Sequence, residues 1–128
     1  DYELFCGVTS DPAADAVQDF TISVQDLKAM LDERAAGTRD FVLVDVREPV
    51  EWSIVAIDGS EFIPKGEFLT GEAFEKLPQD KQVVLYCRSG GRSAEALVAA
   101  KGAGFDAIHV GGGINAWVSE FEPGKPTY

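Results

Sequence analysis

The sequence has 128 residues, 45% of them hydrophobic and 26% charged, a composition typical of one globular domain with enough apolar side chains for a core. A net charge of -11 disfavours nucleic-acid binding, which needs basic patches, and no apolar run reaches the roughly 18 to 20 residues of a membrane span. Two cysteines are too few for a disulfide scaffold, so we expect a cytoplasmic chain with free thiols and with neither a nucleic-acid nor a membrane partner.

The first 19 residues differ from the rest of the chain. They contain five acidic residues and no lysine or arginine, whereas residues 20–128 hold 17 acidic and 11 basic residues. Their second half, SDPAADAVQD, reads as a polar linker, and the chain starts with Asp1 rather than methionine. We therefore expect residues 1–19 to be the tail of a preceding domain plus a linker, and residues 20–128 to form the folded domain.

Short buried strands alternate with helices along residues 20–128. The segment 41–46, FVLVDV, is almost continuously apolar, which is typical of a strand covered on both faces in a parallel sheet. Strands are expected at 21–22, 41–46, 83–86 and 107–110, and helices from 23 to about 37 and at 48–55, 71–77, 94–102 and 114–121. This order predicts an α/β fold, a central parallel sheet with helices on both faces. Ligand sites in such folds lie beyond the carboxyl ends of the strands, here the segments 45–48, 87–93 and 111–113.

The segment after the strand at 83–86 contains the reactive candidates. Cys87 ends the strand, and Arg88-Ser89-Gly90-Gly91-Arg92-Ser93 leads directly into a helix. Unpaired N–H groups at the helix start, the helix dipole and the two arginines favour a negatively charged, nucleophilic sulfur. The two glycines allow the loop to curl around an anion. We predict that Cys87 is the catalytic nucleophile and that residues 88–93 bind its anionic substrate.

Other polar residues near the strand ends have plainer interpretations. Asp45 and Arg47 either form an ion pair that closes the strand or support the pocket by shaping and charging it. The glycines at 111–113 are expected to make a tight turn beside the loop, and His109 to be an ordinary strand residue. Cys6 is either incidental, a thiol that exchanges with Cys87, or a residue that belongs to a missing domain. One histidine and the absence of closely paired cysteines argue against a metal site, so none is predicted.

The run from Cys87 to Ser93, CRSGGRS, resembles the active loop of rhodanese sulfurtransferases. DVRE at 45–48, followed by Glu51-Trp52, and GGGINAW at 111–117 resemble further rhodanese segments, so the likeness covers about residues 20–122. It implies the three-layer rhodanese-like fold and a mechanism in which Cys87 takes sulfane sulfur from a donor, thiosulfate or a cysteine desulfurase, as a persulfide. The persulfide passes its terminal sulfur to an acceptor, and no cofactor is expected in this chain.

The ends of the chain are similar to one branch of that family. YELFCG at 2–7, IPKGEF at 63–68 and KPTY at 125–128 resemble the fused adenylyltransferase and sulfurtransferase proteins. This resemblance implies that a missing N-terminal adenylating domain activates the C-terminus of a ubiquitin-like sulfur-carrier protein. The Cys87 persulfide then supplies sulfur for molybdopterin, thiamine or thiolated-tRNA synthesis. The ATP-binding glycines and zinc cysteines of the adenylating half are absent from this sequence.

Two alternative functions remain open. Cysteine phosphatases have five residues between the cysteine and the arginine, whereas four separate Cys87 from Arg92, so the shorter loop favours sulfur over phosphoryl transfer. A non-catalytic docking module for a sulfur carrier would keep the fold without the chemistry. The chain also departs from the family at 58–64, which reads DGSEFIP where many rhodaneses have a Gly-His-Ile-Pro-Gly segment, so no role is assigned to a histidine there.

Overall fold

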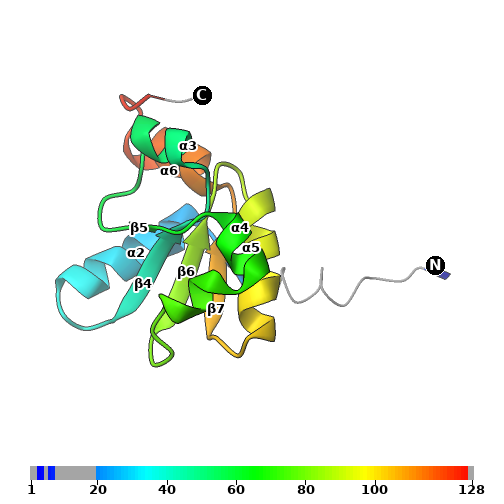
Figure 1. Cartoon of the computed structure of the whole chain (residues 1–128). Coiled ribbons are helices and arrows are strands. Elements are labelled where there is room, and N and C mark those ends of the chain that lie inside the picture. Colours follow the sequence, from blue (N-terminus) through cyan, green and yellow to red (C-terminus); the bar gives the residue numbers. More distant parts are fainter. Residues whose placement is uncertain (1–2, 5, 8–19, 127–128) are drawn as a thin grey trace.

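The structure is a computed structural model that describes residues 3–4, 6–7 and 20–126 (Figure 1). Near the start, β1 (Glu3–Leu4) and β2 (Cys6–Gly7) form an antiparallel pair separate from the main sheet. The rest of the expected tail and linker, at 1–2, 5 and 8–19, lies outside the described residues, as does the side chain of Cys6, so both expectations stay predictions. No helix in the described part has the length and hydropathy of a membrane span.

A parallel sheet forms the centre of the domain, and each neighbouring pair of its strands runs in the same direction. In spatial order the strands are β3 (Thr21–Ile22), β7 (Ala107–Val110), β6 (Gln82–Tyr86), β4 (Phe41–Asp45) and β5 (Glu61–Phe62). The predicted α/β fold with a central parallel sheet is confirmed. The sequence pattern missed β5 because a two-residue strand with an exposed glutamate has no hydrophobic periodicity.

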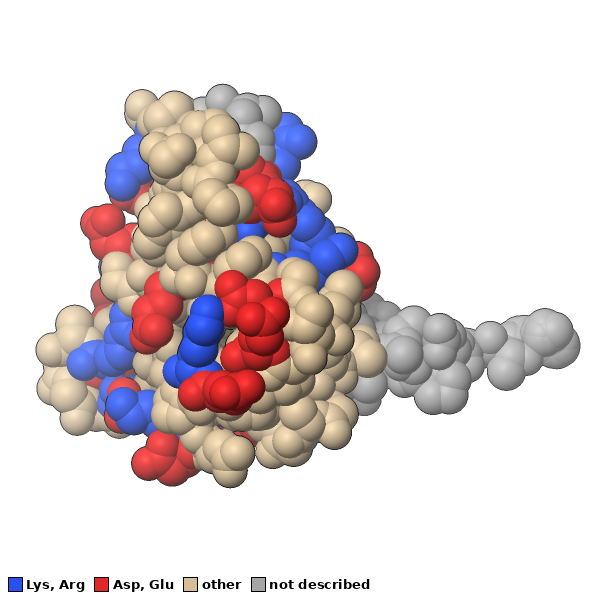
Figure 2. Space-filling view, in the orientation of Figure 1, with Lys and Arg blue, Asp and Glu red and all other residues tan. Residues whose placement is uncertain are grey.

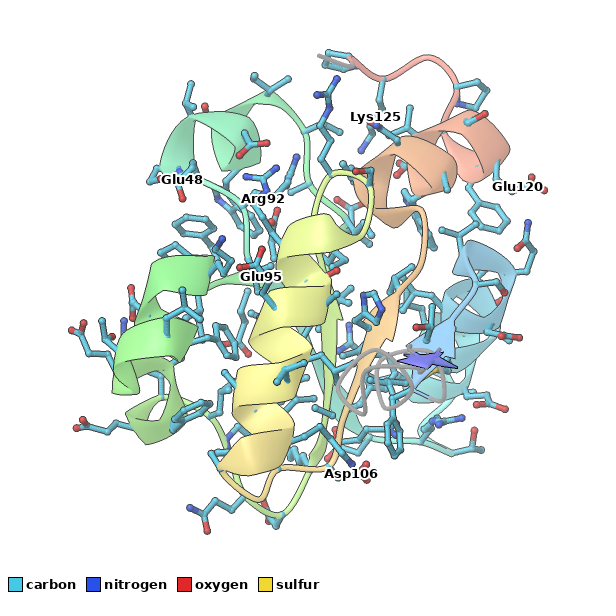
Figure 3. The ribbon with its side chains drawn as sticks, turned by 90° about the vertical axis from the view of Figure 1, so that its right-hand side faces the viewer. Glu48, Arg92, Glu95, Asp106, Glu120 and Lys125 are labelled. Carbon is cyan, nitrogen blue, oxygen red and sulfur yellow. The ribbon has the colours of Figure 1, made fainter. Side chains whose placement is uncertain are left out.

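Alternate strand residues enter two separate cores, one on each face of the sheet. Val42 and Val44 belong to the first core and Phe41 and Leu43 to the second, as expected from the alternation of side chains along a strand. The first core is covered by α4 (Lys65–Thr70), η1 (Glu72–Glu75) and α5 (Gly91–Gly102), and the second by α2 (Val24–Ala35) and α6 (Gly113–Phe121). With α4 and α5 on one side of the sheet and α2 on the other, Figure 3 shows the three layers that were predicted.

Two helical segments differ from the sequence expectation. Helix α5 begins at Gly91, three residues earlier than expected, because Gly90 adopts a φ of +122° and turns the chain into the helix at once. The helix expected at 71–77 is only the short 3-10 helix η1, and the α-helix is α4, immediately before it. Gly71, with a φ of +94°, is therefore both the C-cap of α4 and the N-cap of η1. Helix α3 (Pro49–Ile54) matches the prediction at 48–55 and has no buried residue.

Charged side chains of both signs share the surface. Figure 2 shows Lys and Arg side chains next to Asp and Glu side chains on the face turned to the viewer. Exposed ion pairs such as Lys28–Asp32 at 2.7 Å and Lys81–Asp40 at 3.2 Å have this arrangement. Because such pairs contribute little to stability individually, the fold depends on the two cores rather than on surface charge.

Candidate active site

The loop after β6 holds Cys87 beneath the first turn of α5. The Cys87 side chain is buried, with 1% of its surface exposed. Its Sγ accepts a hydrogen bond from the Gly90 N–H at 3.1 Å and lies 3.5 Å from Ser93 Oγ. A backbone N–H directed at a sulfur is a suitable donor for a negative charge on it, whereas Ser93 Oγ accepts from the thiol. The structure therefore brings the predicted nucleophile and two of its predicted loop residues together.

The start of α6 fixes the loop from the other side. The Ile114 N–H donates to the Cys87 carbonyl at 2.8 Å, and the Asn115 N–H donates to the Arg88 carbonyl at 3.1 Å. Gly113 lies so close that a Cβ built on it would be 2.3 Å from the Cys87 carbonyl oxygen. The prediction that the glycines at 111–113 turn tightly beside the loop is confirmed, because this approach needs a residue without a side chain.

Arg92 has an acidic partner that the sequence interpretation did not assign. Its guanidinium forms two hydrogen bonds with the carboxylate of Glu51 in α3, at 2.5 and 2.8 Å. Figure 3 shows Arg92 at the top of α5, facing the segment that carries Glu48. The pair is mostly shielded from solvent, with exposed side-chain fractions of 29% and 13%. Glu51 therefore compensates part of the charge that Arg92 was expected to lend to the sulfur, and that expectation stays a prediction.

The remaining predicted loop residues lie at the mouth of the loop. Arg88, Ser89 and Gly91 are exposed, and Gly90 is half-buried. Arg88 is therefore accessible from solvent. That Arg88 and the N–H groups of the first turn of α5 bind a negatively charged donor or acceptor stays a prediction.

Asp45 and Arg47 form a buried ion pair at the end of β4. Both side chains are fully buried, and the Arg47 Nε lies 2.9 Å from each Asp45 carboxylate oxygen. Arg47 also donates to the Val55 carbonyl and so attaches the segment after α3 to the sheet. Asp45 is paired in register with Tyr86, whose side chain belongs to the core beneath α2 and α6, whereas Cys87 belongs to the opposite core. Of the two roles left open by the sequence, the geometry favours the ion-paired strand terminus.

His109 is connected to the loop, which the sequence interpretation missed. It is a strand residue, as expected, but its Nδ1 lies 2.9 Å from Ser93 Oγ and its Nε2 2.9 Å from Thr21 Oγ1. The side chain is buried, and burial lowers the pKa of His109. The available signal was the chain's single histidine, on the strand that leads into the glycines beside the loop.

Comparisons with known proteins agree with this geometry. The sequence matches the rhodanese-like domain family over residues 23–120. It is 51% identical, over its whole length, to the probable adenylyltransferase/sulfurtransferase MoeZ of Mycobacterium tuberculosis and spans 32% of that protein. It is 36% identical over 88 residues to a sulfurtransferase of Allochromatium vinosum, an alignment that covers 68% of this chain and 80% of the relative.

A solved structure gives the same assignment. The rhodanese-related protein of Thermoplasma volcanium superposes with a TM-score of 0.68 at 31% identity, over 83% of this chain and 94% of that one. The part of this chain that matches the rhodanese-like domain family includes the complete loop from Cys87 to Ser93 and the turn that fixes it. The chain therefore belongs to the rhodanese-like sulfurtransferase family.

Proposed function

We propose that Cys87 carries sulfane sulfur as a persulfide and passes it to the activated C-terminus of a ubiquitin-like sulfur carrier. The observation that carries this proposal is the position of Cys87 Sγ, 3.1 Å from the Gly90 N–H at the start of α5. With thiosulfate as donor, the thiolate attacks the outer sulfur, the sulfur–sulfur bond of thiosulfate breaks, and sulfite leaves. The product is a Cys87 persulfide anion at a helix start, where the positive end of the helix dipole stabilises negative charge.

The chemistry needs no cofactor in this chain, because the cysteine itself carries the transferred atom. The terminal sulfur of the persulfide extends beyond Cys87 Sγ and becomes the nucleophile toward an electrophilic acceptor. Exposed Arg88 at the mouth supports an anionic donor or an acidic carrier tail there. Asp45 and Arg47 support the site indirectly, by holding the end of β4 beside β6.

The proposed acceptor follows from the relatives. MoeZ of Mycobacterium tuberculosis is described as both an adenylyltransferase and a sulfurtransferase, and this chain spans 32% of its length. A fused adenylating domain would activate the carrier's C-terminal carboxyl as an acyl adenylate. The terminal persulfide sulfur would attack its carbonyl carbon and expel AMP, and an external thiol reductant would then supply two electrons to break the sulfur–sulfur bond. This releases the carrier thiocarboxylate for molybdopterin, thiamine or thiolated-tRNA synthesis and regenerates Cys87. We place this reaction in the cytoplasm, where a reduced thiol persists, with thiosulfate or a cysteine desulfurase as sulfur source.

Phosphoryl transfer is less well supported by the site. A cysteine phosphatase uses its loop arginine to hold the phosphoryl oxygens, whereas here the Arg92 guanidinium is bound by Glu51 at 2.5 and 2.8 Å. The loop also has one residue fewer between cysteine and arginine. Both features favour a smaller sulfur group over a tetrahedral phosphoryl group.

The test is sulfur loading followed by sulfur transfer. The chain is incubated with thiosulfate, its intact mass is measured, and cyanide is added to release thiocyanate. We expect the mass of one added sulfur atom and thiocyanate turnover, both lost in Cys87→Ser. No sulfur adduct, or turnover that survives in Cys87→Ser, would contradict the proposal.

The docking alternative and the acceptor are tested in the full-length protein. If Cys87→Ala complements the pathway as well as the wild type, the domain is a docking module. Capture of a small protein that ends in Gly-Gly supports the proposed carrier, and phosphate release from an aryl phosphate would favour the phosphatase.

A further inference from the structure

A chain of side-chain hydrogen bonds links the reactive sulfur to the edge of the sheet. Cys87 Sγ lies 3.5 Å from Ser93 Oγ, Ser93 Oγ lies 2.9 Å from His109 Nδ1, and His109 Nε2 lies 2.9 Å from Thr21 Oγ1. Ser93 is fully buried and His109 is 4% exposed, whereas Thr21, on the edge strand β3, is exposed. The chain therefore runs from a buried sulfur to the surface through the only histidine of the sequence.

The buried imidazole is suited to reversing the direction of these hydrogen bonds. Burial lowers the pKa of His109 and disfavours its charged form, so the ring has one N–H and one lone pair. Either nitrogen can carry the proton, and each has a hydroxyl 2.9 Å away. A neutral tautomer exchange therefore turns both hydrogen bonds round without placing a charge in the core.

The orientation of the Ser93 hydroxyl depends on His109, because the hydroxyl has a single proton and several neighbours that could accept it. Its oxygen lies 3.2 Å from the Gly90 carbonyl in addition to Cys87 Sγ and His109 Nδ1. When His109 carries its proton on Nε2, Nδ1 accepts from Ser93, and Ser93 Oγ accepts from the Cys87 thiol. When His109 carries it on Nδ1, Nδ1 donates to Ser93 Oγ, and the hydroxyl proton is available to a negatively charged sulfur.

We propose that His109 is a positioning residue for Cys87: by exchanging tautomers it turns the Ser93 hydroxyl from an acceptor for the thiol into a donor for the anionic sulfur. The same chain conducts the thiol proton. The Cys87 S–H bond breaks as Ser93 Oγ gains that proton, Ser93 passes its own proton to Nδ1, and Nε2 passes its proton to Thr21 Oγ1, which releases one to water. One proton leaves, one negative charge remains on sulfur, and no other bond changes.

This inference deepens the proposed function, since it rests on Cys87 as the reacting group. The charged groups at the loop are Arg88, Arg92 and Glu51. They are not members of the hydrogen-bond chain, and substitutions at His109 or Thr21 leave them in place. A change at His109 or Thr21 therefore tests the hydrogen-bond chain without removing the nucleophile or a loop charge.

The experiment measures the rate of Cys87 alkylation by iodoacetamide, which requires no sulfur transfer. In His109→Phe we expect the rate of Cys87 alkylation to fall about tenfold at pH 7, the effect of one charge-assisted hydrogen bond. His109→Asn places an amide near the Nδ1 position and should recover most of the pH 7 rate. Thr21→Val, which has the same shape without the hydroxyl, should lose about two- to threefold at pH 7.

A second measurement distinguishes a reversal of the His109 hydrogen bonds from a role of His109 in packing alone. The nitrogen-15 shifts of the single imidazole should report the protonated nitrogen changing from Nε2 to Nδ1 as Cys87 ionises. Circular dichroism and urea midpoints establish which variants fold, and if His109→Phe does not, the loss of rate in Thr21→Val decides.

A folded His109→Phe or Thr21→Val variant that is alkylated at pH 7 within twofold of the wild type would overturn the inference, as would a tautomer that never changes. An alkylation pattern as expected in a chain that fails to transfer sulfur would instead refute the proposed function alone.

Discussion

Replacing Gly113 with alanine tests whether the start of α6 fixes the active loop. The new Cβ would lie 2.3 Å from the Cys87 carbonyl oxygen and 2.7 Å from both the carbonyl carbon and the carbonyl oxygen of Arg88. These contacts are with backbone, which cannot rotate away as a side-chain end can. Gly113 also has a φ of +54°, a conformation that costs a residue with a side chain roughly 1 to 2 kcal/mol.

The expected loss of stability combines these two effects. Overpacking of this kind typically costs about 1 to 3 kcal/mol. With the backbone conformation included, Gly113→Ala should reduce the free energy of unfolding by about 2 to 5 kcal/mol. If α6 moves to relieve the contact, the hydrogen bonds from the Ile114 and Asn115 N–H groups to the loop carbonyls lengthen as well, so Cys87 alkylation should change along with stability.

Urea denaturation of the variant and of a matched control measures the effect. Gly66 lies within α4, has no positive φ, and a Cβ built on it meets nothing within 4 Å. Gly66→Ala should therefore leave the free energy of unfolding unchanged or raise it by up to about 1 kcal/mol. If Gly113→Ala unfolds within about 0.5 kcal/mol of the wild type, the close approach does not constrain the loop and the reasoning is wrong.

Three further predictions concern charged and titratable groups. Glu51→Gln removes the carboxylate that binds Arg92, so the KM for thiosulfate should fall roughly three- to tenfold with little change in kcat; an unchanged KM in steady-state kinetics would count against this interpretation of the pair. Arg47→Leu leaves the Asp45 carboxylate buried without its partner and should cost about 3 to 5 kcal/mol in urea denaturation, part of which Asp45→Asn restores in the double variant. Burial lowers the pKa of His109 from 6.5, so the unfolded chain binds this proton more readily, and stability should decrease as pH falls below about 6.5. Urea midpoints at pH 7 and pH 5 should differ less in His109→Asn than in the wild type, and an equal difference would contradict the assigned cause.

Local patterns explain what could be predicted before the structure. The capping box of α2 is one example, since Ser23 Oγ accepts from the Asp26 N–H at 3.1 Å and both residues lie within one turn. The loop from Cys87 to Ser93 is another. Cys87, the glycines that follow it and the helix start are adjacent in sequence, so their placement could be inferred together. Gly71 shows where such local inference is ambiguous, because a glycine marks the end of one helix as readily as the start of another.

The sequence by itself therefore determined the fold class and the loop that leads from Cys87 into a helix, because hydrophobic periodicity and adjacent residues encode both. Only the tertiary structure decided which side chains surround that loop. Glu51 and Arg92 are 41 positions apart, Ser93 and His109 are 16 apart, and Thr21 and His109 are 88 apart. The two contacts of His109 depend on β7 lying between β3 and β6, in a register that pairs Thr21 with His109, and the Glu51–Arg92 pair depends on β4 lying beside β6. Strand order and register are set by packing of the whole sheet, so a pattern read along the chain identifies the strands without their neighbours.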